Sequence, residues 1–193
     1  ISAASERKKA EPGPAGGRRA RGLKGHPHRE PAVGGWAVPL PTIDPQIVVR
    51  SARALERYGP DFSYGHYAAV KRLPIALGGM AGAGALMGAA QIPPLRKQLE
   101  KFKSSGDGPS PEQRAKAWFT VTFVGEGAGE RVVCKVSGGD PGYGETAKML
   151  AESALCLAFD DLPETAGQVT TAQAMGGPLT GRLKAAGIAF EVL

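Results

Sequence analysis

The polar residues best suited to chemistry lie in two short segments of the C-terminal third. Asp140 and Tyr143 belong to a turn sequence, residues 137–144, and Thr170 and Thr171 precede a helical pattern. A tyrosine hydroxyl can donate a hydrogen bond or a proton to a carbonyl or an enolate. We treat these four residues as candidate substrate contacts. The competing and stronger interpretation is architectural, with Asp140 capping the amides that follow it and Tyr143 packing on the next helix.

Other chemistry has little support among the nucleophilic and metal-binding residues. Cys134 and Cys156 are the two cysteines and form no CxxC pair, so we interpret them as reduced core residues of a cytoplasmic protein. His26 and His28 lack further ligands nearby, and His66 is interpreted as a sheet residue. No GxSxG or HExxH motif occurs. We therefore expect no metal site and no hydrolase.

One glycine-rich run imitates a dinucleotide-binding loop. Gly82, Gly84 and Gly88 resemble that fingerprint, but the third glycine is one residue late and no Val/Ile-rich strand precedes the run. Pro93 and Pro94 interrupt the chain before Glu100, the first acidic residue that follows. We expect no cofactor-binding residue in this chain.

The candidate residues are placed by a helix-rich C-terminal region. Residues 145–159 show helical spacing and are expected to pack one face on a core. That expected inward face comprises Ala147, Leu150, Ala151, Ala154, Leu155 and Ala158. A second helical pattern runs from Ala174 to Ala186, and residues 188–193 alternate as a short strand.

The middle of the chain indicates strands. Residues 117–124 and 131–136 are rich in β-branched and aromatic side chains, with 125–130 as the hairpin loop between them. We expect residues 62–70 and 188–192 to pair with this hairpin, and a helix over residues 46–58. The predicted class is α+β, a largely antiparallel, mixed sheet with helices packed on one face.

The chain opens with a basic segment. It has 193 residues and a formal net charge of +6, and its first thirty residues hold many of the arginines and lysines. Few large apolar side chains accompany them, so residues 1–34 are predicted to be a disordered linker preceding one domain, residues 35–193. Without interleaved aromatic residues, specific nucleic-acid binding is not expected.

Residues 73–95 carry no charge, and Lys71, Arg72, Arg96 and Lys97 flank them. The length approaches the roughly 20 residues of a membrane span. The composition is mostly Gly and Ala, which drives insertion weakly. We favour a buried or dimer-interface helix, with an interfacial lipid contact and a true span as the alternatives.

A resemblance extends over much of this pattern. The run GDPGYGETAKMLAESALCLAFDDLPETAGQVTTAQAMGGPLTGRLKAAGIAFEVL and the upstream run GGWAVPLPTIDPQIVVRSARALERYGPDFSYGHY resemble saccharopine dehydrogenase-like oxidoreductases, particularly the trans-acting enoyl reductases. The resemblance implies that this chain is a C-terminal substrate and dimerisation domain. It further implies that NADP or NAD is bound by an N-terminal Rossmann domain outside this chain.

The function implied by this resemblance is hydride transfer to a carbon–carbon double bond. The substrate would be a lipid or polyketide intermediate on a carrier protein, and this fragment is expected to be inactive alone. Its expected partners are the Rossmann domain, a second copy of the chain, the carrier-linked substrate and a membrane surface. The alternative function is a non-catalytic lipid- or membrane-associated interaction module, favoured by the basic arm and the uncharged segment.

Overall fold

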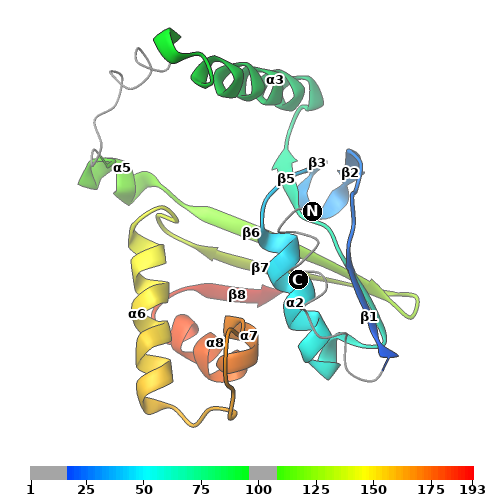
Figure 1. Ribbon diagram of the computed structural model, residues 1–193, viewed down its shortest axis with the longest axis vertical. Helices are drawn as coiled ribbons and strands as arrows, with labels where there is room; N and C mark the ends of the chain where they lie inside the picture. Colours follow the sequence, from blue (N-terminus) through cyan, green and yellow to red (C-terminus); the bar gives the residue numbers. More distant parts are fainter. Residues whose placement is uncertain (1–16, 96–107) are drawn as a thin grey trace. The chain divides into compact units, whose positions relative to one another are not determined.

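The computed structural model describes residues 17–95 and 108–193 (Figure 1). The described residues divide into two compact units. The first consists of residues 17–26, 39–67 and 153–181, and the second consists of residues 27–38, 68–95, 108–152 and 182–193.

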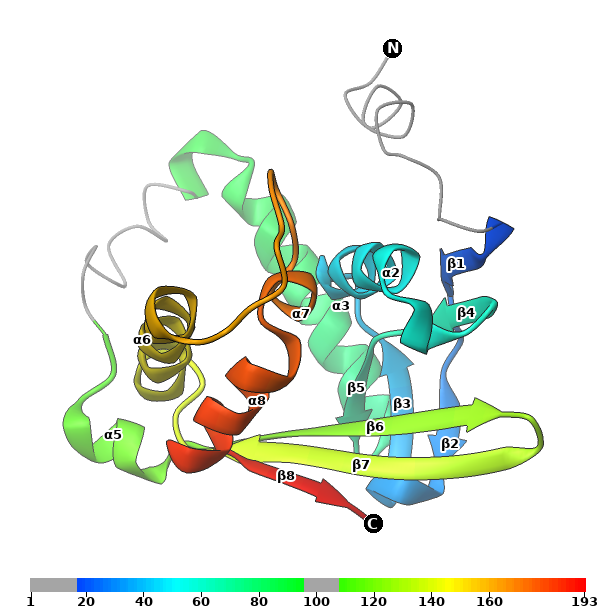
Figure 2. The same ribbon diagram turned by 90° about the horizontal axis from the view of Figure 1, so that it is seen from below.

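Helix α2 (Asp44–Ala54) organises the first unit by packing on a two-stranded parallel sheet. The strands are β1 (Arg19–Gly22) and β4 (Asp61–Tyr64), with Arg19 opposite Asp61 and Gly22 opposite Tyr64 (Figure 2). Pro45 in the first turn of α2 suits the missing N–H and fixed φ of proline. The unit also contains η3 (Glu56–Tyr58), α7 (Thr171–Ala174), the end of α6 (Gly144–Phe159) and the start of α8 (Gly176–Ala185). Its buried side chains include Val49, Ser51, Ala52, Cys156, Thr170 and Met175.

The linker prediction is wrong for residues 17–34, whereas residues 1–16 lie outside the described residues. Strand β1 pairs with β4, and β2 (His28–Glu30) belongs to a sheet of the second unit. The Arg18 guanidinium donates hydrogen bonds to the carbonyls of Leu55 (2.7 Å) and Arg53 (3.0 Å). A cation is favourable where a helix ends because its last carbonyls lack partners. A basic side chain can bind the end of a helix, and composition alone does not reveal this.

The second unit contains two three-stranded sheets. One has the order β2, β3 (Gly35–Pro39) and β5 (Tyr67–Val70). The other has the order β6 (Phe119–Gly127), β7 (Glu130–Gly138) and β8 (Ala189–Val192) (Figure 2). The α+β class is therefore confirmed, with mostly antiparallel strands and helices.

The expected single sheet is wrong, although the C-terminal strand pairs with the hairpin as predicted. Residues 62–70 do not form one strand, because β4 and β5 are separate and belong to different sheets. Gly35 helps to explain the partner of β5: a Cβ on Gly35 would lie 2.6 Å from the Val70 carbonyl oxygen. The close approach of β3 and β5 therefore requires glycine at this position.

The hairpin turn is tighter than the predicted loop over residues 125–130. Gly127 is opposite Glu130, which leaves only Ala128 and Gly129 in the turn. Both have positive φ, 52° and 82°, as a type I′ turn requires. Both strands therefore continue up to the turn. The small and charged residues near the turn had led to the prediction of a longer loop.

Helix α6 confirms a helical prediction but reverses its faces. The residues expected inward are exposed, and Leu150 is 73% exposed. The better-shielded side contains Cys156 and two ion-paired glutamates: Glu145 pairs with Lys148 (2.8 Å) and Glu152 with Arg182 (3.5 Å). Pairing allows charged residues to occupy the shielded side, and hydrophobic spacing alone does not reveal this.

Helix α3 (Leu73–Ala90) covers most of the uncharged segment. A Cβ on any of its five glycines would meet nothing within 4 Å, and Met87 is 71% exposed. Among the described residues, no helix combines the length and apolar character needed to cross a membrane.

Candidate functional site

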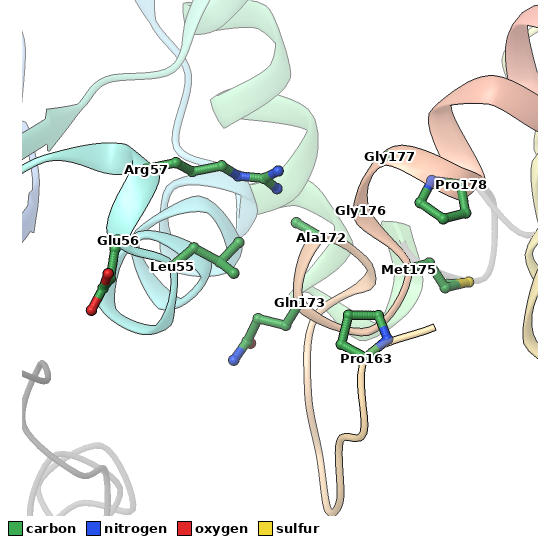
Figure 3. Close-up of a pocket in the computed structure, with 10 residues that line it drawn as sticks. All are labelled: Leu55, Glu56, Arg57, Pro163, Ala172, Gln173, Met175, Gly176, Gly177 and Pro178. Carbon is green, nitrogen blue, oxygen red and sulfur yellow. The ribbon is translucent and has the colours of Figure 1, made fainter. Parts of the chain in front are cut away.

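A pocket of about 330 Å³ lies in the first unit, between the end of α2, η3 and the start of α8 (Figure 3). Most of its lining is apolar. The lining residues are Leu55, Glu56, Arg57, Pro163, Ala172, Gln173, Met175, Gly176, Gly177 and Pro178. Ligand pockets typically have volumes of about 300–1,000 Å³ and a mostly apolar lining with a few polar groups. The volume lies at the lower end of that range, and the hollow is open to solvent, since half of its lining residues are exposed: Glu56, Arg57, Pro163, Gly177 and Pro178.

A hydrogen-bonded cap positions α7 at the pocket. Gln173 Oε1 lies 3.1 Å from the backbone nitrogen of Thr170 and accepts its hydrogen bond. The Thr170 hydroxyl lies 2.8 Å from the hydroxyl of Ser51 on α2. Because Thr170 and Ser51 are both buried, this contact fixes the start of α7 against α2. The next residues, Ala172 and Gln173, are thereby placed in the pocket wall.

The floor and the polar end of the pocket differ in character. Met175 is only 4% exposed, and its flexible thioether suits an irregular apolar surface. Figure 3 shows the Arg57 side chain extending towards Ala172, whereas the Glu56 carboxylate points away from the other lining residues. The pocket therefore joins an apolar wall to one guanidinium group.

The two candidate threonines lie beside this pocket without lining it. The Thr170 hydroxyl lies 2.8 Å from Ser51 Oγ and 3.1 Å from Gln173 Oε1, and its single hydrogen is donated to one of these two acceptors at a time. Thr171 is the exposed first residue of α7 and immediately precedes the lining residue Ala172. Thr170 thus acts as a helix cap, and the pocket itself was missed from the sequence. The capping pattern from Thr170 to Gln173 was a sequence feature that indicated the helix turn in the pocket wall.

Asp140 and Tyr143 belong to the second unit, where their geometry is architectural. The Asp140 carboxylate accepts backbone hydrogen bonds from Gly144 (2.9 Å), Tyr143 (3.0 Å) and Gly142 (3.2 Å). These bonds, led by that of Gly144, hold the pKa of Asp140 below its ordinary value, and the charge of Arg114 adds to the effect. Tyr143 is 50% exposed. The structure thus brings Asp140 and Tyr143 together as the start of α6.

His66 is part of a second polar cluster in the first unit. It lies between β4 and β5, with its Nδ1 3.1 Å from the Tyr64 hydroxyl and its Nε2 3.9 Å from an Asp44 carboxylate oxygen. Burial, and then the Asp44 charge, raises the pKa of Tyr64, whereas a hydrogen bond from Thr42 mainly lowers the pKa of Asp44. The interpretation of His66 as a sheet residue did not predict these contacts with Tyr64 and Asp44. The Tyr-x-His spacing was the sequence signal for one of them.

In the described part of the chain the cysteines do not gather with other metal-binding side chains, and the glycine run is helical. Cys156 is buried and Cys134 is half-buried, and no group of three metal-binding side chains occurs within residues 17–95 and 108–193. Gly82, Gly84 and Gly88 lie inside helix α3 rather than in a loop after a strand. Their amides are thus committed to a helix, which differs from the strand–loop–helix arrangement that binds a pyrophosphate.

Comparison with known proteins gives one consistent relationship. The chain is similar to proteins named trans-acting enoyl reductases. It is 34% identical over 160 residues to a Mycobacterium tuberculosis protein for which this name is provisional, a match over 76% of this chain and 38% of that protein. It is 32% identical over 154 residues to the trans-acting enoyl reductases of Mycobacterium ulcerans and Mycobacterium leprae, covering 73% of this chain and 37% of each relative.

The chain therefore spans less than two fifths of the length of these curated relatives. No family model and no solved structure matches it.

Proposed function

We propose that this chain is the substrate-side part of an enoyl reductase that acts in trans on a lipid or polyketide intermediate held by a carrier protein. The observation that carries the proposal is the 34% identity over 160 residues to a protein provisionally named a trans-acting enoyl reductase. The apolar pocket supports it, because a reduced acyl chain needs an apolar surface near the reacting centre. Within the proposal, the enzyme belongs to the saccharopine dehydrogenase-like oxidoreductases.

The reductant in this proposal is NADPH or NADH, which supplies a hydride when it is bound. The described residues do not fit a dinucleotide, so we assign the cofactor to an N-terminal Rossmann domain of the complete enzyme. The match covers only 38% of the relative, which leaves room in such proteins for that domain. This chain would then cover the cofactor domain, bind substrate and contact a second copy.

Calorimetric titration of NADPH and NADH tests this division of labour. The chain is titrated alone and also after it replaces the matching segment of the Mycobacterium ulcerans relative. We expect binding only to the chimera. Tight binding to the chain alone would show that the glycine run in α3 is a cofactor site after all, and no binding to a folded chimera would count against the reductase proposal.

The second candidate is a non-catalytic lipid- or membrane-associated module. Helix α3 favours it, because Leu86 and Met87 are exposed on a helix without charge and Lys71 and Arg72 precede that helix. Sedimentation with anionic vesicles, for the wild type and for Leu86→Asp, tests this function. Binding that the substitution abolishes without changing the circular dichroism would favour it, and the absence of vesicle binding would exclude it.

A further inference from the structure

We propose that the Tyr64 hydroxyl donates a hydrogen bond to the carbonyl oxygen of the substrate as negative charge develops on that oxygen, and that His66 and Asp44 position the hydroxyl. The carbonyl is that of an enoyl thioester, so this part rests on the proposed function. The three residues belong to the first unit, and Asp44 begins helix α2 whereas the pocket lies at its other end. Helix α2 has 11 residues and is therefore about 16 Å long, a distance that a long acyl chain can span.

The position of this cluster in the sheet favours a ligand site. Strands β1 and β4 are parallel, and Gly22 is opposite Tyr64 in their last pair, so Tyr64 lies at the carboxyl end of the sheet. The first turn of α2 lies at the same end, because a Cβ on Gly22 would be 3.9 Å from the Cβ of Pro45. In open α/β sheets, ligands bind in the crevice outside the carboxyl ends of parallel strands. Tyr64 and Asp44 therefore lie where such a sheet binds its ligands.

The contact between Tyr64 and His66 can leave the phenolic hydrogen available to a ligand. The Tyr64 hydroxyl oxygen lies 3.1 Å from His66 Nδ1. When Nδ1 carries a hydrogen, it donates to the hydroxyl oxygen, and the phenolic hydrogen can point to another acceptor. His66 Nε2 lies 3.9 Å from an Asp44 carboxylate oxygen, which is too far for a hydrogen bond but close enough for attraction between charges. Asp44 therefore attracts an imidazolium, which carries a hydrogen on both nitrogens.

Tyr64 is suited to donate its hydrogen at neutral pH. Burial, and then the Asp44 charge, raises the pKa of its hydroxyl, so the phenol remains protonated until a ligand oxygen accepts from it. The side chain is half-buried, and a hydrogen bond to an oxyanion is stronger in a partly dry site than in water.

Complete proton transfer would also balance within the cluster. The O–H bond of Tyr64 breaks and the substrate oxygen receives the proton, which leaves a phenolate. The Nδ1–H of a His66 imidazolium then protonates the phenolate and leaves a neutral imidazole. The His66 side chain is 23% exposed, so water can return a proton to the ring.

Apolar side chains near Asp44 suit the remainder of the substrate. Leu40, Ile43 and Ile47 are exposed, and Ile43 and Ile47 are one helical turn apart. The Leu40 amide donates a hydrogen bond to the His66 carbonyl at 2.9 Å, which places Leu40 beside the cluster. Sites for small molecules typically combine an apolar surface with a few precisely placed polar groups. The cluster therefore fits a carbonyl group that is attached to an aliphatic chain.

Titration of the whole chain with 4-nitrophenolate tests the oxyanion site without a cofactor. This probe carries its negative oxygen on an apolar ring, and its absorption changes when that oxygen accepts a hydrogen bond. We expect Tyr64→Phe to weaken binding at least tenfold. Tyr58→Phe is the matched control, because Tyr58 lies on η3 and its ring contact with Phe62 does not need the hydroxyl. Its binding should equal that of the wild type.

Two substitutions of His66 test its positioning role in the same titration. His66→Leu should weaken binding several-fold, because the Tyr64 oxygen loses its donor. His66→Gln should recover part of that loss, since an amide can still donate to the hydroxyl oxygen. Thermal melts establish that each variant folds.

The same variants in the chimera with the Mycobacterium ulcerans relative test the reaction. Removal of one oxyanion donor typically lowers kcat by about 10²–10³-fold. We therefore expect Tyr64→Phe to lower kcat by about 100-fold while NADPH binding is unchanged, and Tyr58→Phe to change neither.

Two results would overturn the role of Tyr64. One is the absence of 4-nitrophenolate binding by the folded wild type, and the other is an equal response of binding to Tyr64→Phe and Tyr58→Phe. The proposed function is tested separately. Tyr64-dependent binding with an inactive chimera would refute only the reductase, whereas an active chimera that is insensitive to Tyr64→Phe would refute only the catalytic role of Tyr64.

Discussion

The hydroxyl oxygens of Ser51 and Thr170 lie 2.8 Å apart in the interior of the first unit, although 119 positions separate the two residues. Ser51 Oγ also donates to the Ile47 carbonyl at 3.0 Å, and Thr170 begins the cap of α7. This contact therefore joins α2 to the helix turn that carries Ala172 and Gln173. The pocket wall depends on this contact.

Replacement of Thr170 by valine should destabilise the first unit by about 1–3 kcal/mol, because Ser51 loses a buried partner and α7 loses its cap. Urea unfolding followed by circular dichroism measures this change. Thr171→Val is the matched control, since Thr171 is exposed and should change the free energy of unfolding by less than about 0.5 kcal/mol. Equal effects of the two substitutions would contradict the role given to the buried hydroxyl pair.

Arg18→Gln should lower the free energy of unfolding by about 1–2 kcal/mol, because the end of α2 loses charge-assisted hydrogen bonds. Arg19→Gln provides the control, since Arg19 is exposed on β1 and has the same charge. Chemical unfolding of both variants distinguishes a specific helix contact from a general loss of charge. A stable Arg18 variant would support the linker prediction made from composition.

Asp44→Asn should lower the pKa of Tyr64. The Asp44 charge raises that pKa, but burial is the larger cause and remains in the variant, so the pKa should still exceed its ordinary value. NMR titration of ¹³C-labelled tyrosine measures it. Asp61→Asn is the control. Asp61 is on the same strand as Tyr64, but its carboxylate is paired with Arg21 at 3.6 Å. An unchanged Tyr64 titration in Asp44→Asn would rule out the coupling.

Asp140 should make folding sensitive to acid. Its folded-state pKa is lowered, so its stabilising contribution is complete above the unfolded-state pKa and is lost as the pH falls through the folded-state pKa. Unfolding measured from neutral to acid pH should therefore depend less on pH in Asp140→Asn than in the wild type. Parallel pH curves for the two proteins would show that the three backbone hydrogen bonds do not stabilise the carboxylate.

The sequence predicted those features that local chemistry determines. The β-branched runs around the turn at Ala128 and Gly129 identified the hairpin, and the Asp140 turn identified the start of α6. Spacing identified α6 as a helix but assigned its faces wrongly, because the pairing of Glu145 and Glu152 with cations depends on neighbours in space. The hydrogen bonds from Arg18 to helix carbonyls could not be predicted for the same reason.

The pocket could not be predicted from the sequence for a similar reason, because its lining depends on which segments meet in space. Its lining combines residues 55–57 with residues 163, 172–173 and 175–178, two segments separated by more than a hundred positions. Thr170 and Thr171, which the sequence suggested as substrate contacts, adjoin the second segment without lining the pocket.

The most direct test of the proposed function is NADPH oxidation in the presence of an enoyl thioester of phosphopantetheine. The enzyme for this test is the Mycobacterium ulcerans relative with its matching segment replaced by this chain. We predict substrate-dependent oxidation of NADPH and a product with a saturated carbon–carbon bond, confirmed by mass spectrometry. A folded chimera that binds NADPH but leaves the double bond intact, while the unaltered relative reduces it, would contradict the assignment of this chain to an enoyl reductase.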